Sequence, residues 1–272
     1  PDMELAVHRL GRICEIWKLL INQITVLETM TPLDFLDFRN LLVPASGFQS
    51  YQFRYIEALL GLKMGGRHGK NYYMQQFKSK HINELKDYEN TETLLDLVNK
   101  WLSRFPFFKG HYWEDYESLK SDNSFWKDYF FLYGESLSNG ENKEKKLKDF
   151  SLNFMDDNNS DEFTLQVNRT ALFIILFRDY PLLQQPFKVI DRLIEVDQLM
   201  STWRYRHMTM VRRMIGMRTG TGGTTGKGYL EGAASHNHIF NNFAGLSTYL
   251  IERRNLPRLP KKLIAELSFL KR

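Results

Sequence analysis

One histidine lies on an apolar helical seam and could hold a metal or a cofactor. The seam comprises Val196, Met200, Trp203, His207, Met210 and Met214. Steps of three and four residues are typical of one face of an α-helix, so the His207 imidazole is expected to point inward. An unpaired buried ring nitrogen costs roughly 1–3 kcal/mol. Two interpretations follow: a hydrogen-bonded core histidine, or a neutral imidazole that ligates haem iron from one side.

Phe35 and Arg39 form a second pair with chemical potential. They are four residues apart and so share one face of a helix. An aromatic ring beside a planar guanidinium, which can bind a carboxylate through two parallel hydrogen bonds, suits an aromatic amino acid as ligand. The alternative is a surface arginine lying over a core phenylalanine, and the local sequence alone favours it.

The glycine-rich stretch 220–228 resembles a phosphate-binding loop, but its spacing is wrong. Thr221 stands where that motif requires its first glycine, and Gly228 replaces the serine or threonine that should follow the lysine. A helix is also expected before the stretch, where the motif needs a strand. We therefore reject nucleotide binding and interpret the stretch as a ligand-closing loop or a plain connector.

The remaining metal-binding residue types give weaker signals. His236 and His238 are two residues apart, so on a helix their side chains would diverge. The single cysteine, Cys14, excludes an intrachain disulfide and a four-thiolate zinc site within one chain. Cys14 lies on an apolar stripe with Leu10 and Trp17, and we expect it to be a small core residue rather than a nucleophile.

Helical periodicity dominates the elements that must position these residues, and it predicts an all-α fold. The expected helices are 3–30, 32–42, 48–62, 91–105, 113–133, 163–178, one opened by Pro186 that continues past Met214, 239–251 and 261–270. Thr31, Pro32 and Asp34 supply an N-cap hydroxyl, a proline at the first helical position and an acid at the third. They predict a new helix after a change of direction.

Composition narrows the class of protein. The 272 residues are 43% hydrophobic and 25% charged, as in globular proteins, and we expect one helical domain over 1–272 with a polar surface excursion around 136–162. The net charge is only +5, so nucleic acid is not expected as a partner. The basic cluster of Arg204, Arg206, Arg212 and Arg213 is interpreted as a solvated or anion-facing surface. No apolar run approaches the length of a membrane span, so no membrane partner is expected.

Several of these stretches, in this order, resemble the tryptophan 2,3-dioxygenase family. They are residues 27–35, 38–39 and 44–50 on the substrate side, residues 203–207, 214–216 and 220–223 on the haem side, and residues 246–251 near the end. The resemblance extends over essentially the whole chain and is weakest from 65 to 162. It implies an elongated helical bundle with a haem pocket between helices.

The resemblance also implies an activity and its site. The family uses haem b and O2 to open the indole ring of L-tryptophan, giving N-formylkynurenine, and works as a cytoplasmic homotetramer. By similarity, His207 is the axial ligand of the haem iron, Arg39 pairs with the substrate carboxylate, Phe35 packs on the indole and Thr221 contacts the polar head of the amino acid. Haem neighbours implied in the same way are Ser46, Arg54, Trp203 and Tyr229.

One part of the family pattern does not occur in these residues. The distal histidine of the family lies in an N-terminal His-Gln-x-Tyr-Glu-Leu-Trp-Phe-Lys-type helix, and His8 belongs to the helix that follows it. We therefore expect an upstream segment, in the same or a separate chain, to complete the pocket. Two other classes stay open: a relative that senses or stores haem without turnover, and a structural helical bundle in which His207 is hydrogen-bonded.

Overall fold

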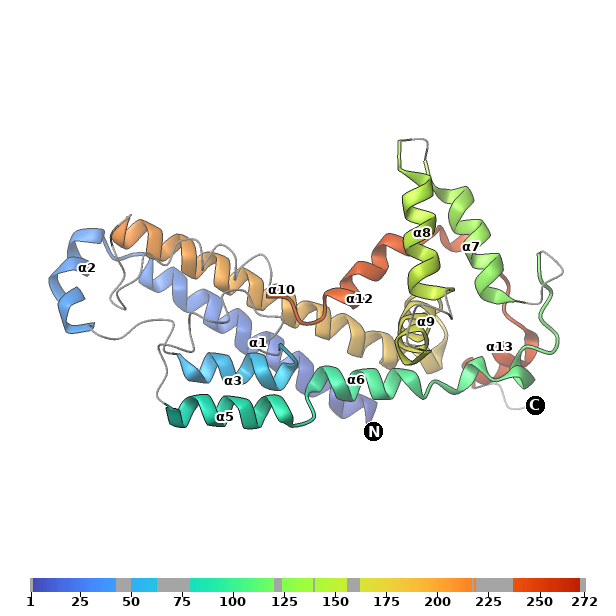
Figure 1. Ribbon diagram of the computed structural model, residues 1–272, viewed down its shortest axis with the longest axis horizontal. Helices are drawn as coiled ribbons and strands as arrows, with labels where there is room; N and C mark the ends of the chain where they lie inside the picture. Colours follow the sequence, from blue (N-terminus) through green and yellow to red (C-terminus); the bar gives the residue numbers. More distant parts are fainter. Residues whose placement is uncertain are drawn as a thin grey trace. The chain divides into compact units, whose positions relative to one another are not determined.

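The computed structural model describes residues 2–42, 50–62, 79–119, 124–138, 140–155, 162–216, 218 and 237–269. Within these ranges every regular element is a helix, which confirms the all-α prediction (Figure 1). The chain divides into two compact units. Unit 1 comprises Pro1–Val7, Val98–Asp191 and Asn242–Arg272, and unit 2 comprises His8–Leu97 and Arg192–Asn241. The single domain expected over 1–272 stays a prediction.

Unit 2 is built around two long helices. They are α1 (Met3–Leu27) and α10 (Pro181–Ile215), each of which also contributes residues to unit 1. Residues further along α1 contact residues further along α10. Cys14 Sγ lies 3.8 Å from the Arg192 carbonyl oxygen, and the later Thr25 Oγ1 accepts a hydrogen bond from the Arg206 guanidinium at 3.1 Å. The two helices therefore run parallel, side by side (Figure 1).

Cys14 is fully buried on α1, as its position on the apolar stripe predicts. Burial raises the pKa of its thiol to about 11, with the Glu195 carboxylate adding to the shift. The thiolate form is therefore scarce at neutral pH, and the prediction of an unreactive core cysteine is supported.

The shorter helices of unit 2 are α2 (Pro32–Arg39), α3 (Tyr51–Leu60) and α5 (Ser79–Asn90), with a 3-10 turn at Asn40–Leu42. α3 and α5 pack through a cluster around the buried Leu85 that includes Tyr51 and Tyr55. Gly61 ends α3 with φ 125°, a conformation that L side chains rarely adopt. A Cβ at Gly61 would also lie 2.6 Å from Leu95 Cβ, so both the backbone and the packing require glycine there.

Unit 1 is held together by a dense aromatic core. Its helices are α6 (Leu94–Ser103), which begins in unit 2, α7 (Phe125–Ser136), α8 (Lys143–Phe154), α9 (Glu162–Leu176), α12 (Asn241–Gly245) and α13 (Lys261–Leu267). Short 3-10 turns are Pro106–Phe108, Gly110–Tyr112, Leu246–Tyr249 and Arg253–Asn255. The Phe150 ring of α8 stacks against both Tyr129 and Tyr133 of α7.

Three predicted helices differ from the structure. The helix expected over 239–251 is α-helical only at Asn241–Gly245 and continues as the 3-10 turn Leu246–Tyr249. The helix expected over 113–133 begins only at Phe125, because the buried Asp128 carboxylate accepts hydrogen bonds from Tyr116 Oη, Ser118 Oγ and the Leu119 amide and so holds that segment in an irregular conformation. Pro186 does not open a helix but lies inside α10, which starts at Pro181. The residue that opens α10 is Pro181, at the first helical position, where a proline's missing amide hydrogen costs no helical bond.

The polar stretch 136–162 contains α8, and part of it packs into the core of unit 1. Phe150 and Phe154 are fully buried, whereas Leu152 on the same helix is 41% exposed. No helix in the described ranges is long and apolar enough to cross a bilayer.

Replacing Phe150 by alanine is expected to lower the free energy of unfolding by about 3–5 kcal/mol, because it removes a fully buried aromatic side chain. Leu152→Ala, two residues away on the same helix, is the matched control and should cost less than about 1 kcal/mol. Urea unfolding of both variants measures the difference. Equal midpoints would show that α8 is not part of the core.

Candidate functional site

The predicted seam of α10 is confirmed as an inward-facing stripe. Val196, Met200 and Met214 are buried, and Trp203 and His207 are half-buried. The Trp203 and His207 rings, one helical turn apart, stack at 5.1 Å between centroids and 2° between planes. The indole therefore restricts rotation of the imidazole about its χ angles and sets the plane of the ring.

His207 is in the chemical form that a metal ligand requires. Burial lowers the pKa of its imidazole, so the neutral ring predominates at neutral pH. Among the described residues no hydrogen bond reaches either ring nitrogen. The interpretation of His207 as a hydrogen-bonded core histidine therefore has no support in this part of the chain.

The donor set around His207 decides which kind of metal would fit. Within the described ranges, no group of three or more His, Cys, Asp or Glu side chains is arranged to hold a metal ion. A single imidazole suits a metal that brings its other ligands with it, as the iron of haem brings four porphyrin nitrogens. The described residues therefore fit haem better than a bare ion.

Aromatic rings extend from His207 into the interior of unit 2. Trp203 stacks on Phe53 of α3 at 5.1 Å and 27°, and Trp17 of α1 meets both rings edge-on, at 6.4 and 5.9 Å. Three helices thus contribute to one aromatic cluster beside the imidazole. Its apolar character suits the flat face of a porphyrin and explains the loss of solvation at His207.

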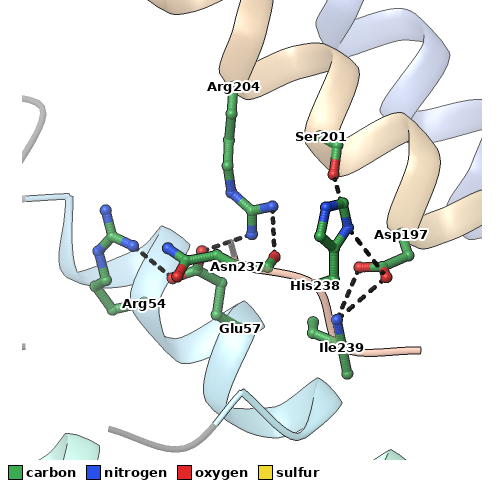
Figure 2. Close-up of polar contacts among 8 residues, drawn as sticks. All are labelled: Arg54, Glu57, Asp197, Ser201, Arg204, Asn237, His238 and Ile239. Atoms are coloured by element: carbon green, nitrogen blue, oxygen red, sulfur yellow. Dashed lines mark hydrogen bonds and ion pairs between the residues drawn. The ribbon is translucent and has the colours of Figure 1, made fainter. Parts of the chain in front are cut away.

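Two arginines meet one carboxylate next to this cluster. Arg54 Nη1 donates to Glu57 Oε2 at 2.5 Å, and Arg204 Nη2 donates to Glu57 Oε1 at 2.7 Å (Figure 2). Arg204 Nη1 also donates to the Asn237 carbonyl oxygen at 2.9 Å. Of the two interpretations of the basic cluster, solvated or anion-facing, the anion-facing one is confirmed for Arg204, which is 6% exposed and faces the Glu57 carboxylate in the interior and not on the surface.

Ser201, His238 and Asp197 lie together but do not form a nucleophilic triad. Ser201 Oγ and Asp197 Oδ2 both approach the same His238 nitrogen, Nδ1, at 3.4 and 3.6 Å (Figure 2). A triad needs the hydroxyl and the carboxylate on opposite ring nitrogens. The Asp197 carboxylate instead accepts from the backbone amides of Ile239 and Phe240, at 3.0 and 3.1 Å, and fastens that segment to α10.

The Phe35–Arg39 pair lies on α2, whose start is fixed as the sequence predicts. Thr31 and Asp34 form a capping box, in which each side chain bonds the backbone amide of the other. Hydrogen bonds from the Thr31 hydroxyl and amide lower the pKa of Asp34, so the box stays charged at neutral pH. Phe35 and Arg39 are both half-buried, and the Phe35 ring meets Phe38 edge-on at 5.4 Å.

An ion pair joins the chain just before α2 to α10, one residue before His207. The Arg206 guanidinium, next to His207 in the chain, pairs with Glu28 just beyond the end of α1. From Glu28 to the Thr31 cap the chain advances three residues, a span of at most about 11 Å. The helix that carries Phe35 and Arg39 therefore starts a few residues after a position that is paired with α10 at the residue next to His207.

Three of the sequence-predicted site residues, Ser46, Thr221 and Tyr229, lie outside the described residues. The sequence analysis missed Glu57 as a member of the site. One local signal was available, because Glu57 follows Arg54 by three residues on a helix whose neighbouring positions, Ala58 and Leu60, are apolar and buried. Its second partner, Arg204, is 147 residues away and could not be paired from spacing.

Fold and site together define a helical protein in which the neutral imidazole of His207 stacks on Trp203 beside an aromatic cluster. The sequence profile of the family described as tryptophan 2,3-dioxygenase matches residues 2–250. The tryptophan 2,3-dioxygenase of Bdellovibrio bacteriovorus is 40% identical, over 98% of this chain and 80% of its own length. Those of Dictyostelium discoideum and Rattus norvegicus are 38% and 35% identical, over 97% and 95% of this chain and 70% and 68% of their own lengths. The chain belongs to the tryptophan 2,3-dioxygenase family.

Proposed function

We propose that this chain is a haem-dependent dioxygenase in which His207 ligates the iron and the indole ring of L-tryptophan is opened with O2 to give N-formylkynurenine. The observation that carries the proposal is the neutral His207 imidazole, held in plane by Trp203 and without a hydrogen-bond partner among the described residues. Membership of the family supports both the activity and the haem. The non-catalytic and structural alternatives are not favoured.

Haem, when bound, supplies the iron at which dioxygen is activated. The role of the protein chain is to bind and orient the groups that react. His207 holds the iron from one face, and the stacked Trp203 ring keeps the imidazole plane fixed. Trp203, with Ser46, Arg54 and Tyr229, is proposed to neighbour the haem, the last two near its propionates.

Substrate placement is assigned to α2 and to Thr221. The Arg39 guanidinium would bind the tryptophan carboxylate, Phe35 would pack on the indole, and Thr221 would contact the polar head of the amino acid. A cation meets an anion and a ring meets a ring, so each role agrees with the chemistry of the side chain. Fixing both ends of the substrate holds the indole double bond in place for reaction, which removes orientational entropy from the barrier.

The finer features of the assembly are proposed on the same basis. The cofactor would be haem b, as the resemblance to the family implies, and the sequence, with Cys14 as its one cysteine, contains no C-x-x-C-H motif for covalent attachment of the porphyrin. A cytoplasmic homotetramer follows from the resemblance to the family. The exposed apolar side chains of α1, among them Ile16, Leu19 and Val26, provide surface that association would cover.

Replacing His207 by alanine is expected to abolish the absorption spectrum of histidine-ligated haem while leaving the helical circular dichroism in place. The change removes the proposed iron ligand from a half-buried position and leaves the fully buried residues of α10, such as Val196 and Met200, in place, so the helix should persist. His111→Ala, at an exposed position in unit 1, is the control and should keep the spectrum. An unchanged spectrum in His207→Ala would refute the assignment.

Replacing Arg39 by lysine is expected to lower kcat/KM for tryptophan. The loss of transition-state stabilisation should be about 2–5 kcal/mol, because a single ammonium cannot reproduce the bidentate contact. Arg12→Lys, at an exposed position on α1, is the control. Steady-state kinetics of both variants provide the measurement. Normal kinetics of Arg39→Lys would place the carboxylate-binding group elsewhere.

A further inference from the structure

The Glu57 carboxylate is the most deeply buried charge near the proposed haem ligand. Its side chain is 0% exposed, and those of its partners Arg54 and Arg204 are 8% and 6% exposed. Each carboxylate oxygen accepts from a different guanidinium (Figure 2). We call these three residues the Glu57 hub.

Stability alone is a poor explanation for the Glu57 hub. Burying charged groups removes their solvation by water, and the attraction between them often does no more than offset that loss. A protein with well-packed apolar residues in their place is frequently as stable as one with the ion pair. The hub is also incompletely satisfied, since Arg204 Nε, although buried, has no hydrogen-bond partner among the described residues. Charged hydrogen bonds of fixed geometry do, however, define which surfaces meet and in which register.

The Glu57 hub fixes the register of α10 against α3 at the turn that carries His207. Arg204 precedes His207 by three residues, so the two side chains leave adjacent positions of the helix. On α3, Phe53 precedes Arg54 and stacks on Trp203, which in turn stacks on His207. A shift of α10 along α3 would therefore break the hub and tilt the imidazole together.

Both arginines also contact the ring that lies between the hub and Trp203. The Arg54 and Arg204 guanidinium carbons lie 5.4 and 5.6 Å from the centroid of the Phe53 ring, within the range of cation–π attraction. The hub therefore holds Phe53 directly, and Phe53 holds Trp203. The path from carboxylate to imidazole is continuous through packed groups of unit 2.

We propose that Glu57 is a positioning residue for His207: through Arg54 and Arg204 it holds the Phe53–Trp203 stack that sets the plane of the axial imidazole. The inference rests on the proposed role of His207 as haem ligand. Glu57 does not touch the haem or the substrate in this account. Its effect on the imidazole passes through the Phe53–Trp203 stack, and Arg54, proposed above as a neighbour of the propionates, is unchanged in the variants below.

Two conservative variants test the role without changing the net charge of the hub. Glu57→Asp keeps the charge but is one methylene too short to reach both arginines, and Arg204→Lys keeps the charge but cannot bond Glu57 and the Asn237 carbonyl in one planar fork. Glu195→Gln is the matched control. Glu195 also accepts from two cations, Lys18 and Arg192, but it lies three turns before His207 on α10 and is 25% exposed.

The first readout is the iron–histidine stretching band in the resonance Raman spectrum of the ferrous, haem-loaded protein. The second is the rate at which haem is lost to an excess of a haem scavenger, and the third is the pair of steady-state constants for tryptophan. In Glu57→Asp and Arg204→Lys the iron–histidine band should shift and broaden. Haem loss should accelerate about 10- to 100-fold, which is the usual effect in other proteins when a residue that orients a metal ligand is replaced. kcat should fall more than KM changes. Glu195→Gln should match the wild type.

A different pattern would overturn the inference. If both hub variants melt at lower temperature but keep the wild-type band and the wild-type rate of haem loss, Glu57 serves folding only. The proposed function fails separately, if the wild-type protein shows no iron–histidine band or if His207→Ala retains it.

Discussion

The negative charge of a carboxylate that is buried away from water must be balanced by cations or hydrogen-bond donors of the fold. In unit 2 this constraint applies to Glu57, whose side chain is 0% exposed. Its two oxygens are shared between an arginine on its own helix and an arginine on α10, so the charges balance only when α3 and α10 meet in one register. The aromatic stack that reaches His207 is assembled by the same contact. On the inference drawn above, the register of α10 against α3 and the orientation of His207 therefore depend on one pairing.

Local chemistry explains which parts of the fold could be predicted. The capping box at Thr31 and Asp34 and the apolar period of α10 are encoded within a few residues, and the structure confirms both. The irregular segment before α7 was not predictable, because a buried partner, Asp128, overrides its helical pattern from nine to twelve residues away. α8 has a polar composition that hides its two buried aromatic rings.

The candidate site also has features that could be predicted from the sequence and features that could not. The inward direction of His207 follows from periodicity, and the shared face of Phe35 and Arg39 follows from their spacing. The proposal that His207 is a ligand rather than a core histidine draws on geometry that spacing does not contain, namely the parallel Trp203 ring and the absence of a hydrogen-bond partner among the described residues. The contribution of Glu57 needed a contact between residues 147 positions apart, which no single-sequence pattern contains.

The central claim is that the iron of haem is held by the imidazole of His207, and chemical rescue tests it most directly. His207→Gly should leave a cavity that admits free imidazole, so titration with imidazole should restore the histidine-ligated haem spectrum in a saturable manner. Without imidazole the variant should lack that spectrum. A variant that shows the full histidine-ligated spectrum before any imidazole is added would contradict the account, because another residue would then hold the iron.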